Sequence, residues 1–303
     1  MKLTVLDIGG TSIKYAKYEN GVLENFSECN TEAYEGGPYV IQKVIKIIHG
    51  LGKCDGIGIS TAGQVDFERG CIRYANDNIP DYTGMEIRKI LEEEFEVPVS
   101  VENDVNAVAI GEGKFGAARG ISDYLCLTYG TGVGGAAVID GKLLRGCGGS
   151  AAEFGSMIIH GEHVNQGGVL EGCYEYYSST SALVQKFQER FPYIANGRQV
   201  FEKLEIPAIQ MLVDEWIREI AHGLVTLIHI FNPKCVILGG GVMNQAYVVE
   251  AVRRRVKECI MPSFCDVEIL AASLGNKAGL WGAVYIASGG CVKKRRNEYE
   301  RQK

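Results

Sequence analysis

Two stretches share one pattern: LTVLDIGGTSIKYAKYENG at residues 3–21 and YLCLTYGTGVGGAAVIDG at residues 124–141. Each runs from an apolar strand through a glycine turn into a second strand. In the second stretch these two strands are predicted at residues 124–129 and 133–139. Each then ends in a two-residue hairpin signal, Asn20-Gly21 or Asp140-Gly141. The repetition predicts one three-stranded unit that occurs twice, and therefore two related domains that face each other across a cleft.

The rest of the chain alternates apolar runs with amphipathic segments, which is typical of an α/β protein. The apolar runs predict buried strands at residues 56–60, 98–101, 235–238 and 267–270. The amphipathic segments predict helices at residues 38–50, 85–95, 105–115, 178–191, 206–231, 247–259 and 276–287. We expect a first domain at 1–117 and a second at 118–275, with the helix near 276–303 packing back on the first.

Composition argues against nucleic acid and membranes as partners of this protein. The 303 residues carry a formal charge of −6, whereas a nucleic-acid binder normally has a basic surplus. No apolar stretch reaches membrane-spanning length, and the first residues lack a signal peptide's features, so we expect a cytoplasmic protein. The ten cysteines are scattered without a CxxC pair, which favours reduced thiols. The charged tail VKKRRNEYERQK is expected to be solvated.

Three glycine-rich turns follow apolar strands: Gly9-Gly10-Thr11, Gly130-Thr131-Gly132 and Gly239-Gly240-Gly241. Successive backbone N–H groups in such turns form concave anion sites, so the three together predict a clamp for nucleotide phosphates. The alternative is three structural turns. The pattern is neither a Walker A loop nor a dinucleotide fingerprint, because Asn244 occupies the last glycine position of the latter.

Four carboxylates stand where chemistry is expected. Asp7 ends the first strand, where it would hold Mg²⁺ directly or through water, or would serve only in the turn. Asp104, in Glu102-Asn103-Asp104, follows a strand and is either a general base for a substrate hydroxyl or a helix cap. Glu153 and Glu175 lie in a glycine-rich stretch and would orient sugar hydroxyls, although either alone fits a surface position.

His160 and His163 lie three residues apart, not far from Cys173. A tetrahedral zinc site needs four good ligands, usually with paired cysteines, and the count here falls short. We therefore expect no structural zinc.

These motifs, in this order, resemble the ROK family of bacterial sugar kinases and sugar-responsive repressors, from Leu3 to about Ser288. The matching segments are Asp7-Ile-Gly-Gly-Thr-Ser-Ile-Lys14, Ser60-Thr-Ala-Gly63-Gln64-Val, Asn78-Ile-Pro80, Glu102-Asn103-Asp104, Thr128-Tyr-Gly130-Thr131-Gly132, Gly149-Ser-Ala-Ala-Glu153-Phe-Gly155, Gly172-Cys173-Tyr-Glu175 and Leu238-Gly-Gly-Gly241. The resemblance implies the actin-like, sugar-kinase ATPase fold, with two domains of duplicated ribonuclease-H-like type and a central cleft.

The resemblance also implies roles for individual residues. Asp104 would be the catalytic base, and Asp7 would lie near Mg²⁺. The sugar would be bound by Gly63, Gln64, Asn78, Asn103, Asp104, Glu153 and Glu175. ATP would be bound by Asp7, Gly9, Gly10, Thr11, Lys14, Thr131, Gly132, Gly239, Gly240 and Gly241. The implied activity is ATP-dependent phosphorylation of a hexose-like sugar (glucose, N-acetylmannosamine, fructose or a β-glucoside) at the 6-hydroxyl, by a homodimer.

The chain departs from the family pattern at one cluster. The family commonly has Glu-x-Gly-His, whose histidine touches both sugar and zinc, but Ser156 occupies that place here. The usual Cys-x-Cys pair is also absent, and only Cys173 remains. The resemblance thus implies that the family's zinc site is lost and that room is gained near the anomeric end of the sugar.

Two other functions compete with a kinase. A sugar-sensing repressor of the same family would carry a helix-turn-helix domain before the first strand, yet the predicted strand begins at Leu3. A non-catalytic actin-like assembly protein would have no use for the Glu102-Asn103-Asp104 loop or for the two sugar glutamates. We therefore expect an ATP- and Mg²⁺-dependent enzyme whose partners are small molecules rather than nucleic acid or membrane.

Overall fold

The computed structural model describes residues 1–164, 171–194 and 196–289, so the charged tail lies outside the described residues. The chain divides into two compact units. The first contains residues 1–116, residues 145–151 and the described residues from Asn276 onward. The second contains residues 117–144 and 152–275. Residues 145–151, which we expected in the second domain, belong to the first unit.

The first unit is built on a five-stranded sheet of order β3-β2-β1-β4-β7. Its strands are β1 (Lys2–Ile8), β2 (Ser12–Glu19), β3 (Val22–Asn30), β4 (Gly56–Thr61) and β7 (Val99–Asn103). A small separate ribbon is made of β5 (Gln64–Asp66) and β6 (Cys71–Tyr74). The helices are α1 (Gly37–Leu51), α2 (Ile87–Phe95), α3 (Asp104–Phe115) and α9 (Ala278–Ala287), and η1 (Ala33–Glu35) is a 3-10 turn.

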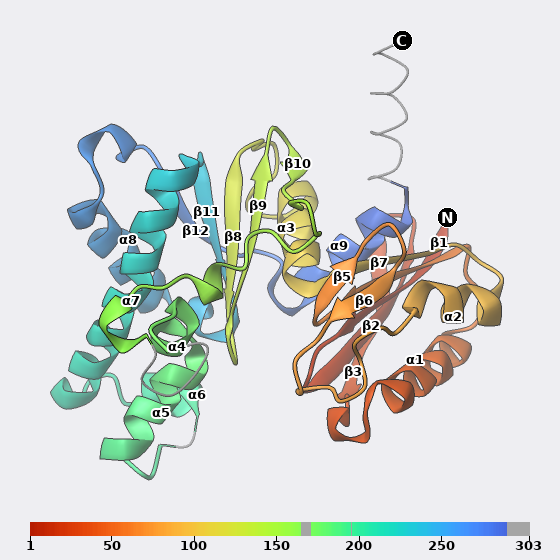
Figure 1. The fold of residues 1–303 in the computed structure, drawn as a ribbon, viewed down its shortest axis with the longest axis horizontal. Helices are drawn as coiled ribbons and strands as arrows, with labels where there is room; N and C mark the ends of the chain where they lie inside the picture. Colours follow the sequence, from red (N-terminus) through yellow and green to blue (C-terminus); the bar gives the residue numbers. More distant parts are fainter. Residues whose placement is uncertain (165–170, 195, 290–303) are drawn as a thin grey trace. The chain divides into compact units, whose positions relative to one another are not determined.

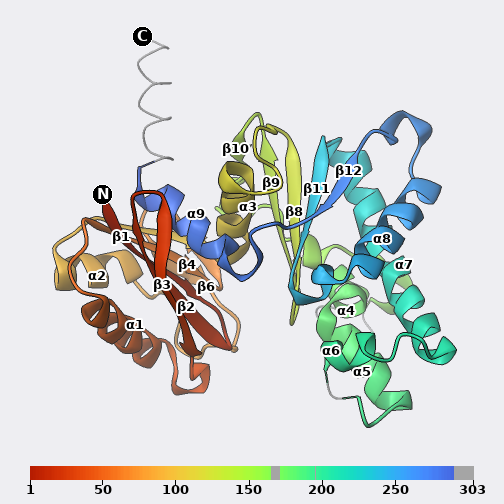
Figure 2. The same ribbon diagram turned by 180° about the vertical axis from the view of Figure 1, so that it is seen from behind.

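Helices cover both faces of this sheet (Figures 1 and 2). On one face, the apolar sides of α1 and α2 pack on Leu6, Ile8 and Ile59. On the other face, α9 packs on Leu3, Val5 and Ala16. The alternation of side chains along β1 explains this division, because successive residues of a strand point to opposite faces.

The second unit repeats the topology with a sheet of order β10-β9-β8-β11-β12. Its strands are β8 (Tyr124–Tyr129), β9 (Val133–Ile139), β10 (Lys142–Leu143), β11 (Cys235–Gly239) and β12 (Glu268–Ala271). In each sheet a strand pairs with an antiparallel hairpin on one side and with parallel strands on the other. The internal repeat predicted from the sequence is thus confirmed by the strand order.

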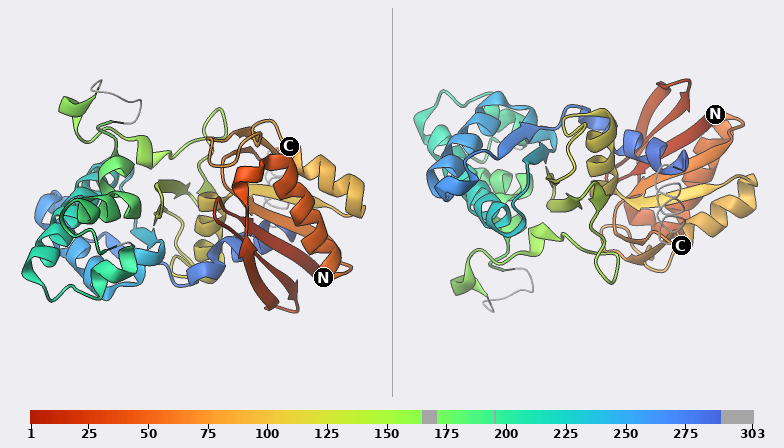
Figure 3. Two further views of the ribbon diagram at one scale, coloured as in Figure 1. Left: turned by 90° about the horizontal axis from the view of Figure 1, so that it is seen from below. Right: turned by 90° about the horizontal axis from the view of Figure 1, so that it is seen from above.

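The helices of the second unit gather on one side of its sheet (Figures 1 and 3). They are α4 (Tyr174–Ser178), α5 (Thr180–Arg190), α6 (Gly197–Phe201), α7 (Pro207–Phe231) and α8 (Ala246–Cys259). Short 3-10 turns are η2 (Phe154–Ser156), η3 (Gly161–His163), η4 (Gly241–Asn244) and η5 (Pro262–Phe264). A further one, η6 (Gly275–Lys277), begins at the last residue of the second unit and continues into the first. Trp216 of α7 is fully buried in the core that these helices form with the sheet.

The helix predicted at residues 178–191 corresponds to α5, which begins two residues later, at Thr180. The short helix α4 before it, which ends at Ser178, was not predicted. Ser179 between them has an extended backbone, and its hydroxyl accepts a hydrogen bond from the Ala182 N–H. A serine in this role caps a helix start, which the amphipathic pattern alone does not reveal.

The described residues contain no helix with the length and apolarity needed to cross a bilayer. All nine cysteines among them are free thiols, and Cys291 lies outside that part of the chain.

Helices α3 and α9 cross closely because glycines line their contact. A Cβ atom on Gly282 would lie 2.0 Å from the Ala107 carbonyl oxygen, and one on Gly111 would lie 2.4 Å from the Ala278 carbonyl oxygen. Since α3 begins at Asp104, this contact anchors the helix that carries the predicted base.

We expect Gly282→Ala to lower the free energy of unfolding by about 1–3 kcal/mol, because the added methyl group forces the two backbones apart. Urea unfolding of wild type and variant measures the change. Gly50→Ala, in α1, is the control, since its Cβ atom would meet no atom within 4 Å. That variant should be neutral or more stable by roughly 0.5 kcal/mol. Equal destabilisation of both variants would contradict the close-packing argument.

Candidate active site

The carboxyl ends of three parallel strands meet at one edge of the first sheet. β1, β4 and β7 are neighbours in parallel register, and the Ala62 N–H donates to the Ile8 carbonyl oxygen just beyond the strands. This edge is where ligands bind in many α/β proteins. The predicted residues Asp7, Gly63, Asn103 and Asp104 are thus brought together.

Asn103, not Asp104, is the N-cap of α3. Its backbone is extended, and its side-chain oxygen accepts from the N–H groups of Val105 at 3.0 Å and Asn106 at 3.1 Å. Asp104 is therefore the first helical residue, so the capping alternative for it is wrong. Asparagine and aspartate are equally good caps, which is why sequence alone did not separate the two positions.

The Asn103 amide also fixes the Asp104 carboxylate. Its Nδ2 group donates to Asp104 Oδ1 at 2.9 Å and to the Gly63 carbonyl oxygen at 3.0 Å. The Val105 N–H also donates to Asp104 Oδ1, at 2.9 Å. These bonds use the full hydrogen-bonding capacity of the Asn103 amide, so Asn103 positions Asp104 and holds it to the loop after β4.

The pKa of Asp104 lies far above that of an ordinary aspartate. Burial disfavours the charged form most, and repulsion from the Asp7 carboxylate adds to it. Hydrogen bonds from Val105 and Asn103 oppose the shift, and the net effect raises the pKa of Asp104 to about 7. A carboxylate with this pKa is suited to accept a proton near neutral pH.

Asp7 is held by neighbours on both sides. The Ser60 hydroxyl donates to Asp7 Oδ1 at 2.6 Å, and Lys14, directly across on β2, places its Nζ 3.5 Å from Oδ2. A Cβ atom on Gly279 would lie 2.9 Å from the carboxylate, so α9 reaches it only because residue 279 is glycine. The fixed anion, with lone pairs left over, fits a role as an oxygen ligand for Mg²⁺ or for its bound water.

The first glycine turn is a tight connection between β1 and β2. The Gly9 N–H donates to the Ser12 carbonyl oxygen at 3.0 Å, and the Thr31 hydroxyl donates to the Gly9 carbonyl oxygen at 2.6 Å. A Cβ atom on Gly10 would lie 4.0 Å from the Cβ of Asn78, so the predicted nucleotide turn and a predicted sugar residue are neighbours.

Glu102 and Arg145 form a buried ion pair that sequence reasoning missed. Glu102 is fully buried, and it accepts from Arg145 Nη1 at 3.3 Å and Nη2 at 2.5 Å. It also accepts from the Asn103 N–H and from Asn106 Nδ2. The guanidinium lies 4.1 Å from the centre of the Phe67 ring. The only sign of this pair in the sequence is that Glu102, a charged residue, lies at the end of an apolar strand. Its partner Arg145 lies 43 residues further along the chain.

Arg145 explains why residues 145–151 belong to the first unit. The segment is tied at its start by Arg145 and near its end by Ser150, whose hydroxyl donates to Gln64 Oε1 at 3.0 Å. Gln64 is a predicted sugar residue at the start of β5. The ion pair thus connects the segment 145–151 to the loop that carries Asp104. The hydrogen bond from Ser150 connects the same segment to the loop that carries Gln64.

In the second unit, two glycine turns lie side by side at the ends of parallel strands. β8 and β11 pair in parallel, with Thr128 opposite Gly239. Gly240 has a φ of 102°, and a Cβ atom there would lie 2.2 Å from the Tyr129 carbonyl oxygen. Glycine is therefore required for the contact. The predicted ATP residues Thr131, Gly132, Gly239, Gly240 and Gly241 are brought together by this strand pair.

The two predicted sugar glutamates lie on adjacent segments. Glu175 of α4 accepts a hydrogen bond at Oε2 from the Val133 N–H at 3.2 Å. A Cβ atom on Gly132 would lie 2.5 Å from the same oxygen, and one on Gly155 would lie 3.1 Å from it. Glu175 therefore contacts both the Gly130-Thr131-Gly132 turn and the segment that begins at Glu153. The Glu153 side chain itself is exposed.

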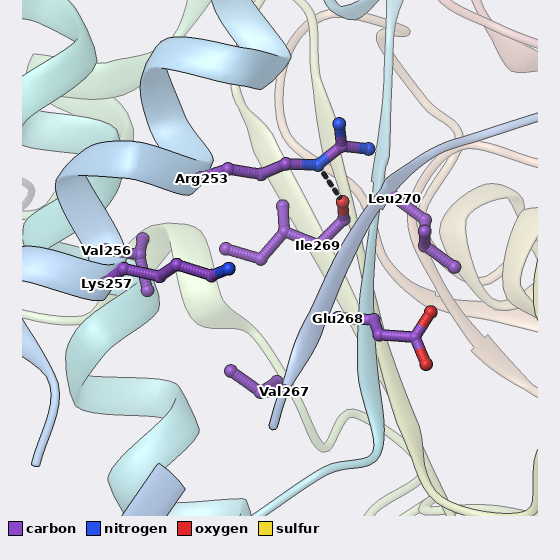
Figure 4. A pocket seen from close by; sticks show the side chains of 7 residues that line it. All are labelled: Arg253, Val256, Lys257, Val267, Glu268, Ile269 and Leu270. Carbon is purple, nitrogen blue, oxygen red and sulfur yellow. Dashed lines mark hydrogen bonds between the residues drawn. The ribbon is translucent and has the colours of Figure 1, made fainter. Parts of the chain in front are cut away.

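A separate hollow lies between α8 and the edge strand β12 (Figure 4). It is lined by Arg253, Val256, Lys257 and residues 267–270, and Arg253 Nε donates to the Ile269 carbonyl oxygen at 2.6 Å. None of the predicted site residues lines it, so it is not part of the candidate active site.

A duplicated five-stranded unit, with glycine turns and acidic side chains at the carboxyl ends of parallel strands, defines the actin-like, sugar-kinase type of ATPase fold. The model of the ROK family matches residues 3–289, and the chain belongs to that family.

Several known proteins are similar to this chain over almost its whole length. An uncharacterised protein of Clostridium perfringens is 41% identical, covering 93% of this chain and 96% of that protein. A β-glucoside kinase of Klebsiella pneumoniae is 30% identical, covering 94% and 95%. A ROK family glucokinase from Streptomyces griseus, solved in complex with glucose and AMPPNP, is 30% identical with a TM-score of 0.82, covering 95% and 99%.

Proposed function

We propose that the protein is an ATP-dependent sugar kinase in which Asp104 is the general base. The observation that carries this proposal is a carboxylate at the first position of α3, aimed by the Asn103 amide, with a pKa of about 7. Membership of the ROK family and similarity to a glucokinase and a β-glucoside kinase support the same activity.

In the proposed reaction, the ionised Asp104 carboxylate accepts the proton of a sugar hydroxyl. The hydroxyl oxygen forms a bond to the γ-phosphorus of ATP as the bond between that phosphorus and the bridging oxygen to the β-phosphate breaks. The electron pair of the broken bond leaves with ADP. Asp104 keeps the proton until it is released to solvent. Asn103 and the buried Glu102 aim the base and do not themselves touch the reacting atoms.

The proposed nucleotide contacts come from the glycine turns. Backbone N–H groups of Gly9, Gly10, Gly132 and residues 239–241, the hydroxyls of Thr11 and Thr131, and the Lys14 ammonium would bind ATP. Asp7 would hold Mg²⁺ through water, and the ion would neutralise charge on the phosphates.

The proposed acceptor is a hexose, bound by Gly63, Gln64, Asn78, Glu153 and Glu175 and phosphorylated at its 6-hydroxyl. Carboxylates and amides at these positions match the hydroxyl groups of a sugar ring. Ser156, which is exposed beside Glu153, replaces a family histidine and leaves room for a substituent near the anomeric carbon.

The experiment is an assay of ADP release with glucose, N-acetylmannosamine, fructose and cellobiose, each compared with its absence. A sugar-dependent rate, lost when the acceptor is 6-deoxyglucose, is expected. A strict preference for unmodified glucose would count against the widened pocket. ADP release that no sugar increases would contradict the proposed activity.

The pH dependence follows from the pKa of Asp104. Because the base must be ionised, kcat/KM should rise about tenfold per pH unit below pH 7 and level off above it. The folded protein keeps the Asp104 proton up to about pH 7, whereas the unfolded chain, in which the pKa of Asp104 is 3.8, loses it at lower pH. Folding stability should therefore fall as pH rises from about 4 to about 7. A kcat/KM that does not change between about pH 6 and pH 8 would exclude Asp104 as the base.

A further inference from the structure

Histidine and glutamate side chains converge at η3 in the second unit. His160, Glu162 and His163 each offer one ligand atom, and these three atoms lie within 4.8 Å of one another. The His160 and His163 rings are stacked, with their centres 5.5 Å apart. Cys173, the third ligand that the sequence offered beside the two histidines, is buried and paired in a β-bridge with Ile158. The carboxylate that joins the histidines comes instead from Glu162.

A second carboxylate orients the His160 ring. His160 Nε2 lies 2.9 Å from Oε2 of Glu219, a mostly buried residue of α7, and His160 Nδ1 lies 3.1 Å from Glu162 Oε1. When Nε2 carries the proton and donates to Glu219, the lone pair on Nδ1 faces another acceptor. Two acceptors at this distance require a proton or a cation between them. A carboxylate behind a ligating histidine is the usual support of a protein metal site.

His163 is supported in a similar way. Its Nδ1 is hydrogen-bonded to the Tyr177 hydroxyl just beyond Glu175 in α4. The ring is therefore held, and its other nitrogen is available as a ligand. Glu162 has 66% of its side chain exposed, so it can adjust to an ion at little cost and leaves a coordination position open to water.

We propose that His160, Glu162 and His163 bind one divalent transition-metal ion of the Zn²⁺ class, with Glu219 positioning His160. Two imidazoles and one carboxylate, with an open fourth position, suit Zn²⁺ and its neighbours and do not suit Mg²⁺ or Ca²⁺, which prefer oxygen ligands. The site differs from the family's cysteine cluster, of which this chain keeps only Cys173.

A metal at this site would stabilise a specific part of the second unit. The ligands lie at residues 160–163, and Glu219 lies on the core helix α7. A bound ion would thus connect residues 160–163 to the core through the hydrogen bond between His160 and Glu219. This inference does not depend on the proposed kinase activity, because its measurements concern metal binding alone.

The test is calorimetric titration of the full chain with ZnCl₂, after chelator treatment and after the exposed thiols are blocked with iodoacetamide. Wild type should bind one ion in a step that His163→Ala and Glu162→Gln abolish or greatly weaken. Glu219→Gln should weaken the same step by about 10- to 100-fold. His49→Ala is the matched control, because His49 pairs with Glu94 at 2.8 Å but belongs to no such cluster within the described part of the chain.

Folding is checked by circular dichroism of each metal-free variant, and Glu162→Gln is the safest, since its side chain is exposed. Zn²⁺ should also raise the Tm of wild type and of His49→Ala, but not that of Glu162→Gln. Identical titrations for wild type and Glu162→Gln, or the absence of a binding step in wild type, would overturn the metal site. Unchanged affinity in Glu219→Gln would overturn the positioning role.

Discussion

Asp104→Asn is expected to lower kcat by about 10²- to 10⁴-fold, the usual cost of losing a general base. The amide is nearly isosteric, and its oxygen can still accept from the Val105 N–H and the Asn103 amide. It cannot accept the proton of a substrate hydroxyl. Sugar binding should remain close to that of wild type. Coupled ADP assays measure the rate, and calorimetry measures the affinity for the sugar.

Measuring the folding stability of Asp104→Asn distinguishes the loss of the base from misfolding of the variant. Wild type must ionise a carboxylate that burial and Asp7 destabilise, so above pH 7 the variant should be at least as stable as wild type. Asp266→Asn is the control, since Asp266 is an exposed aspartate of the second unit. Near-normal turnover in Asp104→Asn would remove the base from the proposed mechanism.

Arg145→Met is expected to lower the stability of the first unit by about 3–5 kcal/mol, because it leaves the Glu102 carboxylate buried without its partner. The two tryptophans make the measurement specific: Trp281 lies in the first unit and Trp216 in the second. In a Trp216→Phe background, the fluorescence of Trp281 during urea unfolding reports the first unit.

Two further variants complete this test. Arg73 lies 3.6 Å from Asp66 with half of its side chain exposed, so Arg73→Met should cost less than about 1 kcal/mol. Combining Arg145→Met with Glu102→Leu should recover most of the lost stability, because no buried charge is left alone. If Arg145→Met costs no more than Arg73→Met, then the buried pair does not hold the segment 145–151 in place.

Local patterns anticipated most of the secondary structure. The expected strands at residues 124–129 and 133–139 match β8 and β9 at both ends, because apolar alternation and a glycine turn mark them clearly. Misses occurred where one side chain decides a boundary. Ser179 caps α5, so that helix begins two residues after the expected start at 178, and Asn103 rather than Asp104 is the N-cap of α3.

Glu162 and Glu219 show more clearly what the sequence does not reveal about the histidine cluster. Glu162 stands between the two histidines in the sequence, yet nothing local distinguishes it from a solvated glutamate. Glu219 lies 59 residues from His160, so the bond between them has no sequence signal at all. Ligand spacing along the chain therefore points to Cys173 and does not reveal either carboxylate.

The sequence by itself determined the repeated three-stranded unit, the places of its glycine turns and the acid after β7, because turns, hairpins and strand ends are set by neighbouring residues. The tertiary structure alone decided which distant groups surround that acid. Burial and then the Asp7 carboxylate raise the pKa of Asp104, and Arg145 neutralises Glu102 across 43 residues of chain. Charges interact through space, and the order of residues along the chain does not state which of them fold to within a few ångströms of each other.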